Sequence, residues 1–195
     1  MAHAATTGVP IDRYLSLEAE DHLRYEYHAG EVYAMSGGTI QHTILSTNIQ
    51  RMLGNAMRDK RKNCIALNSE VKIEIERANR YVYPDAAVVC GKINESDTIK
   101  GAIRNPRVVV EVVSESSGDY DRGAKMRYYL SLPTVKEYVL IEQGRPHVTV
   151  YRRHEDGELG SFHYADGPND TIELTSIGAI LPLEELYQNV TLEKD

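Results

Sequence analysis

Three runs of apolar, β-branched and tyrosine residues constrain the fold of this chain more than any other feature. They cover residues 64–76, 81–90 and 107–113, and polar or glycine-containing segments bound each run. Val, Ile and Tyr favour extended, packed backbone, so each run predicts a strand. With 195 residues, 42% hydrophobic and 26% charged, the chain can bury such strands in one core, and we expect residues 1–195 to form a single domain.

Amphipathic segments beside these runs supply the helices. Apolar residues recur at helical spacing from 44 to 58, and a cap-like cluster at 116–119 begins a second helix that extends to Pro133. Shorter helices are expected at 10–20 and 183–187. This order of helices and strands predicts a mixed sheet with helices packed on it.

Further strands extend the predicted sheet at both ends of the chain. They cover residues 24–28, 31–35, 137–142, 147–153, 159–164 and 171–174. Ala29-Gly30 and Asp156-Gly157 are typical of the turns of two hairpins. The predicted fold class is α/β (α+β), a mixed β-sheet flanked by helices with added N-terminal and C-terminal β-hairpins.

The charge of the chain argues against a general affinity for nucleic acid. The formal net charge is −7 and the pI about 5.5, which opposes approach to a phosphate backbone unless positive charge is local. The basic run at 58–62 is explained as a solvated helix end. No segment has the length of a membrane span, and the first ten residues lack a secretory pattern, so we expect a cytoplasmic protein with no membrane partner.

The sequence lacks the common cofactor and zinc motifs. Cys64 and Cys90 each lie inside an apolar run, so both are expected to be small core residues without a disulfide. No Cys or His cluster has zinc spacing, and no phosphate-binding loop, Gly-x-Gly-x-x-Gly or Gly-x-Ser-x-Gly occurs. No organic cofactor is therefore expected.

The first candidate for chemistry is Asp85, which directly follows Pro84 at the start of an apolar strand. A carboxylate there would stand at the edge of the sheet, where a cation could neutralise it. The alternative is a purely local role, because Pro-Asp pairs favour turns.

The second candidate is Glu111, which lies within the apolar run 107–113. A buried carboxylate costs several kcal/mol unless it is paired or coordinated, so Glu111 requires a cation, a basic side chain or a raised pKa. The alternative is a structural salt bridge.

The third candidate is Lys125, which shares a helical face with Tyr129 and Leu132 and so points toward the sheet. Its helix directly follows the strand of Glu111, so the ammonium could reach that carboxylate. The alternative is a weak surface pair with Asp121 at i−4. Two acids and a lysine suit phosphodiester hydrolysis, because the acids can hold Mg²⁺ while the ammonium offsets charge on the phosphate.

These residues occur in an order that resembles the Uma-type family of bacterial restriction endonucleases, a branch of the PD-(D/E)XK nucleases. The matching motifs are Tyr25-Glu26, Gly30-Glu31-Val-Tyr-Ala-Met35, His42, Pro84-Asp85, Val110-Glu111-Val-Val-Ser-Glu-Ser-Ser117, Asp121-Arg-Gly-Ala-Lys125 and Val135-Lys-Glu-Tyr-Val-Leu-Ile141. The resemblance spans most of the chain. It implies a restriction-endonuclease-like fold, Mg²⁺ or Mn²⁺ bound by Asp85 and Glu111, DNA as substrate, and homodimers.

The chain departs from the wider superfamily at Val113, where a lysine is expected two residues after the strand acid. The resemblance implies that Lys125 takes its place. It also favours Glu26 as a further acid near the site, whereas exposure is the ordinary expectation for Glu26 and Glu31. His42 lies near the apolar face of its helix, so it is either a core histidine or a partner of a metal-bound carboxylate or a phosphate.

Two functions remain open on this sequence. The first is a metal-dependent endonuclease in which Asp85, Glu111 and Lys125 act, with Glu26 and His42 in support. The second is an inactive protein of the same fold that serves as a dimeric interaction or nucleic-acid-binding module, as the acidic net charge and Val113 suggest. Metal-dependent cleavage of DNA separates the two.

Overall fold

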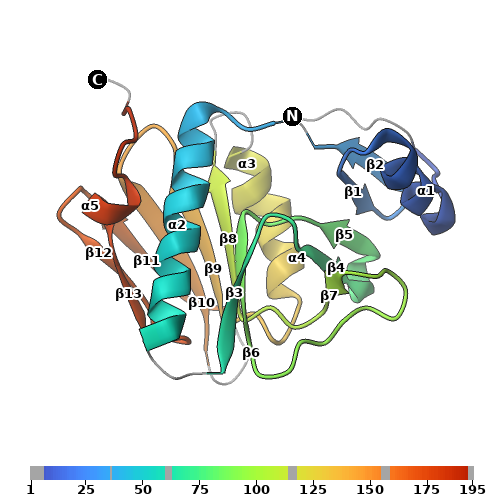
Figure 1. Cartoon of the computed structure of the whole chain (residues 1–195). Helices are drawn as coiled ribbons and strands as arrows, with labels where there is room; N and C mark the ends of the chain where they lie inside the picture. Colours follow the sequence, from blue (N-terminus) through green and yellow to red (C-terminus); the bar gives the residue numbers. More distant parts are fainter. Residues whose placement is uncertain (1–6, 36, 60–62, 114–117, 155–158, 193–195) are drawn as a thin grey trace.

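The computed structural model describes residues 7–35, 37–59, 63–113, 118–154 and 159–192, apart from the side chains of residues 21, 59, 119, 159 and 161. These residues form two larger sheets, a two-stranded sheet and several helices (Figure 1). No helix in the described ranges is long and apolar enough to cross a membrane.

The larger sheet has six strands and is mixed, as predicted. Its strands, in spatial order, are β11 (Leu159–Asp166), β10 (His147–Arg153), β9 (Glu137–Glu142), β8 (Val108–Val113), β6 (Ala86–Cys90) and β3 (Cys64–Asn68). β8 and β9 run parallel, and the other neighbours are antiparallel. The predicted hairpin of β10 and β11 is present, although its turn at Asp156-Gly157 lies outside the described residues.

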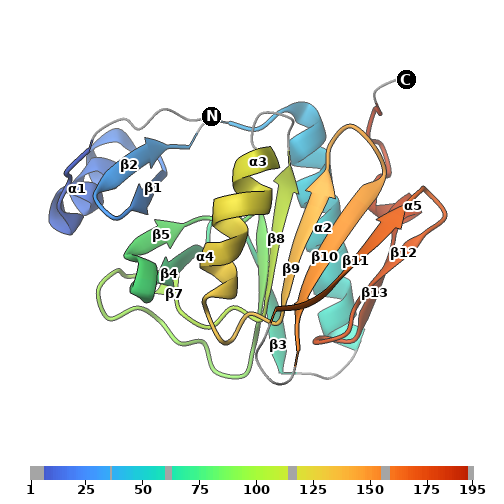
Figure 2. The same cartoon turned by 180° about the vertical axis from the view of Figure 1, so that it is seen from behind.

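Helices cover both faces of this sheet. The long helix α2 (Ile40–Asp59) lies in front of it in Figure 1. α3 (Gly118–Tyr120), the π-helical turn η2 (Asp121–Lys125) and α4 (Met126–Leu130) lie on the opposite face, in front in Figure 2. The second predicted helix is therefore present, with a π-helical turn in its middle.

The alternation of side chains along β8 assigns its residues to these two layers. Val108, Val110 and Val112 belong to the core cluster that contains the apolar face of α2. Val109 and Val113 belong to the second cluster, with residues of α4. Because side chains alternate along a strand, Glu111 lies in the row that faces the α3–α4 side.

The second sheet has five strands beside the α3–α4 layer. In spatial order they are β2 (Glu31–Ala34), β1 (Tyr25–His28), β5 (Arg80–Val82), β4 (Lys72–Ile75) and β7 (Ala102–Ile103). The 3₁₀ turn η1 (Glu76–Ala78) joins β4 to β5, and α1 (Ile11–Asp21) packs its Tyr14 against Tyr27 and Tyr81. The predicted N-terminal hairpin is thus β1–β2, now part of a larger sheet.

Two of the runs predicted as single strands are each divided between the two sheets. The run 64–76 becomes β3 and β4, and the run 81–90 becomes β5 and β6. A turn at Ser69-Glu70 separates the first pair, with the Val71 N–H donating to the Asn68 carbonyl at 3.1 Å. Pro84 separates β5 from β6, because it lacks an N–H that could continue the hydrogen bonds of a strand. Asp85 therefore lies where the chain passes from one sheet to the other.

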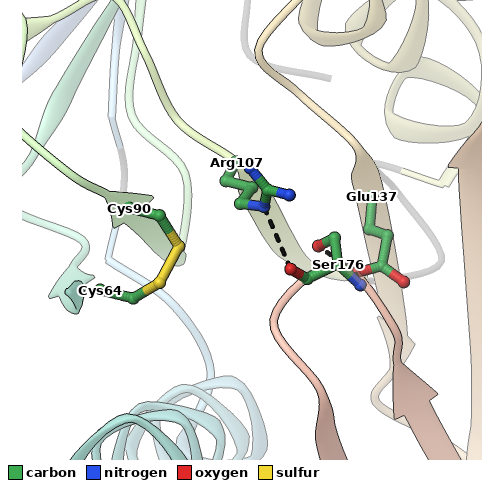
Figure 3. Close-up of a disulfide and its surroundings, with 5 residues drawn as sticks. All are labelled: Cys64, Cys90, Arg107, Glu137 and Ser176. Carbon is green, nitrogen blue, oxygen red and sulfur yellow. Dashed lines mark hydrogen bonds between the residues drawn. A yellow bond between two sulfur atoms is a disulfide. The ribbon is translucent and has the colours of Figure 1, made fainter. Parts of the chain in front are cut away.

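The C-terminal segment forms a small layer on the α2 side. The strands β12 (Thr171–Leu174) and β13 (Ala179–Pro182) pair with each other, and the predicted helix follows as α5 (Leu183–Leu186). β13 was not predicted. Figure 3 shows Glu137 and Arg107, which are both hydrogen-bonded to Ser176 in the turn between β12 and β13.

The expectation of two reduced cysteines was wrong, because Cys64 and Cys90 form a disulfide (Figure 3). They are direct partners on the antiparallel strands β3 and β6, with Cα atoms 3.9 Å apart. A separation of 26 residues in the chain gives no sign of this pairing, which depends on strand register.

Candidate active site

Asp85 is held against β8 by its backbone N–H and by one of its carboxylate oxygens. Its backbone N–H donates to the Val110 carbonyl at 3.0 Å, and Oδ2 accepts the Val112 N–H at 2.7 Å. Oδ1 lies 3.0 Å from Nε2 of His42. A local turn alone does not explain these contacts, since Asp85 is hydrogen-bonded to the backbone of both neighbours of Glu111.

His42 comes to Asp85 from the first turn of α2. The Thr39 hydroxyl accepts the His42 backbone N–H at 3.1 Å and so caps the helix. The hydrogen bond to Asp85 raises the pKa of His42, although burial acts in the opposite direction. His42 is therefore half-buried against a carboxylate and is not packed wholly in the apolar core.

Glu111 is 5% exposed and has two donors at one oxygen. The Lys125 ammonium lies 2.9 Å from Oε1, and the Tyr129 hydroxyl donates to the same oxygen at 2.9 Å. Burial raises the pKa of Glu111 well above its usual value; Lys125 opposes this rise, while the charges of Asp85 and Asp121 add to it. Asp85 and Glu111 are therefore close enough for their charges to repel.

Lys125 points inward from the π-helical turn η2 and is surrounded by acids. Its Nζ lies 2.9 Å from Glu111, 3.5 Å from Glu26 and 4.0 Å from Asp121. Burial alone would lower the pKa of Lys125, but Glu111 and Glu26 raise it well above the usual value, so the ammonium stays charged. The alternative of a surface pair with Asp121 is wrong, because Asp121 is only 5% exposed.

Glu26 adds a third acid from the five-stranded sheet. Its Oε1 accepts the Tyr83 N–H at 3.2 Å, and its Oε2 lies 3.1 Å from Nε2 of His28. Burial would raise the pKa of Glu26, but Lys125, His28 and the Tyr83 N–H together lower it to about 2. Glu26 therefore faces the site as a carboxylate, whereas Glu31 is exposed and accepts a hydrogen bond from Tyr33.

The structure brings together all five predicted site residues, and their catalytic roles stay predictions. Lys125 lies in η2 and Glu26 in β1, whereas His42 lies in α2. Figures 1 and 2 show α2 on the face of the six-stranded sheet opposite α3 and α4. Asp121 and Tyr129, named from the sequence only as helical neighbours of Lys125, also contact this cluster, as does His28, which no sequence pattern singled out. The spacing of Asp121, Lys125 and Tyr129 at four-residue intervals places them on one helical face and so indicates Asp121 and Tyr129 as neighbours of Lys125.

The donor set fits a hard divalent cation better than zinc. Within the described residues, no three His, Cys, Asp or Glu side chains gather as a metal-binding group. Asp85 and Glu111 offer carboxylate oxygens only. Mg²⁺ accepts one or two protein carboxylates and completes its coordination with water and phosphate oxygens, so two acids suffice.

This arrangement on a mixed sheet defines a protein with the restriction-endonuclease-like nuclease fold. The chain belongs to the Uma2 family, which is described as "Putative restriction endonuclease" and whose model matches residues 11–184.

Three known proteins are similar to the chain. An uncharacterised protein of Synechocystis sp. is 30% identical over 193 residues, which are 97% of this chain and 98% of that one. A second uncharacterised Synechocystis protein is 28% identical over 156 residues, or 80% and 87% of the two chains. A crystal structure from Anabaena variabilis, described as "a putative nuclease belonging to DUF820", has a TM-score of 0.75 at 15% identity and covers 94% of this chain and 99% of that chain. This last likeness shows the fold.

Proposed function

We propose that this protein is a metal-dependent endonuclease that hydrolyses DNA phosphodiester bonds with Mg²⁺ or Mn²⁺. The observation that carries the proposal is the contact of 2.9 Å between Lys125 and Glu111, beside an Asp85 carboxylate that accepts the Val112 N–H. The Uma2 family description supports the same reaction class.

Each side chain has a separate task in this reaction. Asp85 and Glu111 would hold the cation, which when bound supplies positive charge that polarises the phosphodiester. His42 and the Val112 N–H fix the orientation of Asp85. The Lys125 ammonium offsets negative charge on the attacked phosphate, and its surrounding acids keep it protonated at neutral pH.

The acidic net charge of −7 is compatible with DNA as substrate only when positive charge is concentrated at the site. Lys125 and a bound divalent cation would together offset three of the four negative charges of Asp85, Glu111, Glu26 and Asp121. The basic run that begins at Arg58 does not contribute, because Arg58 lies at the opposite end of α2 from His42. We therefore expect cleavage to depend steeply on the metal and on Lys125.

The test is incubation of the purified chain with supercoiled plasmid and Mn²⁺. Wild-type protein should produce nicked or linear DNA, and Lys125→Ala should reduce the rate at least a hundredfold, because the ammonium at the phosphate is lost. Arg51→Ala, which removes an exposed ion pair with Glu185 on the outer side of α2, is the matched control and should leave the rate unchanged. Equal background from wild type and Lys125→Ala would favour the inactive interaction protein.

We also propose that two copies of the chain associate through the outer face of β10 and β11. An open groove of about 320 Å³ lies there, lined by His147, Thr149, Tyr151, Phe162 and Tyr164. Phe162 and Tyr164 are 60% and 64% exposed. Among the described residues, β11 is an edge strand of the six-stranded sheet.

The sequence of β11 suits pairing with itself. In an antiparallel pair of two copies centred on His163, Phe162 of one copy lies opposite Tyr164 of the other, so aromatic rings meet across the two-fold axis. Residues 159–165 contain no Lys, Glu or Pro, the residues that commonly protect edge strands. Sedimentation should give a dimer for wild type and a monomer for Phe162→Asp; a wild-type monomer at all concentrations would contradict this.

A further inference from the structure

We propose that His28 is a positioning residue of the nuclease site, which holds one oxygen of Glu26 and thereby keeps the Lys125 ammonium on Glu111. The inference rests on the proposed function for its catalytic consequence. Its structural part is independent of that function, because it concerns contacts among His28, Glu26 and Lys125.

The hydrogen bonds of His28 define its orientation. His28 lies two residues from Glu26 on β1, on the same face of the strand, and is 7% exposed. Nε2 lies 3.1 Å from Oε2 of Glu26, and the Tyr120 hydroxyl lies 3.4 Å from Nδ1 and 3.5 Å from Nε2. A carboxylate only accepts, so Nε2 must carry the proton that His28 donates to Glu26.

Neighbouring rings hold the imidazole in this orientation. The Tyr33 ring centroid is 4.8 Å from that of His28, and the Tyr120 centroid is 6.0 Å away in a stacked arrangement. Tyr33 comes from β2 and Tyr120 from α3, so the imidazole packs between the five-stranded sheet and the helical layer. His28 therefore has a fixed ring plane from which to donate.

Glu26 distributes its two oxygens between different partners. Oε2 accepts the hydrogen bond from His28, whereas Oε1 accepts from the Tyr83 N–H at 3.2 Å and lies 3.5 Å from Nζ of Lys125. Lys125 is closer to Glu111, at 2.9 Å. Glu26 and Glu111 thus compete for the Lys125 ammonium. The position of the ammonium depends on whether the oxygens of Glu26 already accept hydrogen bonds from other donors.

Loss of the His28 donor would change this competition. With Oε2 released, both oxygens of Glu26 could turn toward Lys125 and draw the ammonium away from Glu111. A displacement of about 1 Å at a catalytic group is enough to reduce a rate by a hundredfold. His28 therefore acts through Glu26 on the position of Lys125 and does not itself contact the proposed substrate.

The first experiment compares His28→Leu with His28→Gln in the plasmid assay with Mn²⁺. Gln can donate an N–H from nearly the same position as Nε2, whereas Leu cannot. We expect His28→Leu to lower kcat at least tenfold with KM within twofold, and His28→Gln to retain at least a third of wild-type kcat. His154→Leu, an exposed histidine elsewhere, is the control for histidine replacement and should match wild type. Equal losses in His28→Leu and His28→Gln would overturn the proposal.

The second experiment needs no nuclease activity and no substrate. The ¹⁵N chemical shifts of the His28 imidazole should show a proton on Nε2 in the wild type. Glu26→Ala removes the acceptor and should shift both nitrogens toward the average of the two tautomers. Shifts that are unchanged by Glu26→Ala would overturn the proposal even if the enzyme cuts DNA. A wild type that fails to cut DNA would reject the proposed function, while these spectra still decide the role of His28, including when His28→Leu does not fold.

Discussion

Two buried glutamates on adjacent strands, Glu137 on β9 and Glu111 on β8, have very different surroundings. Glu137 is 1% exposed and Glu111 is 5% exposed. Glu137 accepts the backbone N–H and the hydroxyl of both Thr175 and Ser176, and it also pairs with Arg152 at 3.0 Å. Five donor groups thus bond to its carboxylate, and the four from Thr175 and Ser176 tie the turn between β12 and β13 to the sheet.

Glu111 has fewer hydrogen-bond donors around it than Glu137, and it also has acidic neighbours. Lys125 and Tyr129 both donate to its Oε1, while Asp85 and Asp121 add negative charge nearby. A buried carboxylate with many donors stabilises the fold, whereas one crowded by other acids is better explained by a cation that arrives from solution. The comparison indicates a structural role for Glu137 and supports the catalytic role that we propose for Glu111.

The largest expected effect is on folding, at Glu137. Glu137→Ala should lower the free energy of unfolding by about 3–5 kcal/mol, because Arg152 and the groups of Thr175 and Ser176 lose their common acceptor. Urea unfolding followed by circular dichroism measures this, since the chain has no tryptophan for fluorescence. A loss below 1 kcal/mol would remove the distinction between the two glutamates.

The second prediction concerns pH and Glu26. Folding lowers the pKa of Glu26 from its ordinary 4.5 to about 2, so its ionised form stabilises the fold above pH 4.5, and this stabilisation is lost as the pH falls toward 2. Glu26→Gln should therefore cost about 3 kcal/mol at pH 7 and much less near pH 2.5. Urea unfolding at both pH values checks this, and an equal cost at both would contradict the charged state of Glu26.

The third prediction separates activity from stability at Glu111. Glu111→Gln should reduce the rate of plasmid cleavage at least a hundredfold, a loss of about 2.7 kcal/mol in transition-state stabilisation. The free energy of unfolding should stay equal or rise, because the raised pKa of Glu111 means that its ionised form is disfavoured in the fold, and Lys125 keeps Glu26 and Asp121 as partners. A fall in stability as large as that of Glu137→Ala would make Glu111 a structural residue as well.

The smallest effect is expected at His42, which contacts one acid of the site from α2. His42→Ala should lower the cleavage rate about tenfold, because Asp85 keeps the Val112 N–H at 2.7 Å but loses its second partner. Weaker binding of Mn²⁺ should accompany the loss. A rate equal to wild type would make His42 a packing residue.

Local sequence signals predicted much of the site. Glu111 could be predicted because a charged residue within an apolar run needs a partner when it is buried. Lys125 could be predicted because helical spacing indicates that its side chain points toward the sheet. The long helix, the hairpins and the strand of Glu111 follow from side-chain periodicity, which is a property of a few neighbouring residues.

Features that depend on partners distant in the chain were missed. In the runs 64–76 and 81–90, apolar residues continue on both sides of Ser69-Glu70 and of Pro84-Asp85, so composition did not show that each run contributes to two sheets. The Cys64–Cys90 bond depends on the register of β3 and β6. His28 acquires its role only when β1 packs against α3, which no nearby residue indicates.

The most direct test of the account is calorimetric titration of Mn²⁺ into the wild-type protein and into Asp85→Asn, without DNA. Asp85 and Glu111 should bind a single ion in the wild type, and replacement of one carboxylate by an amide should weaken binding at least tenfold, because hard cations prefer charged oxygen ligands. Equal affinity in the two proteins, or no binding to the wild type, would contradict a metal site at these two acids.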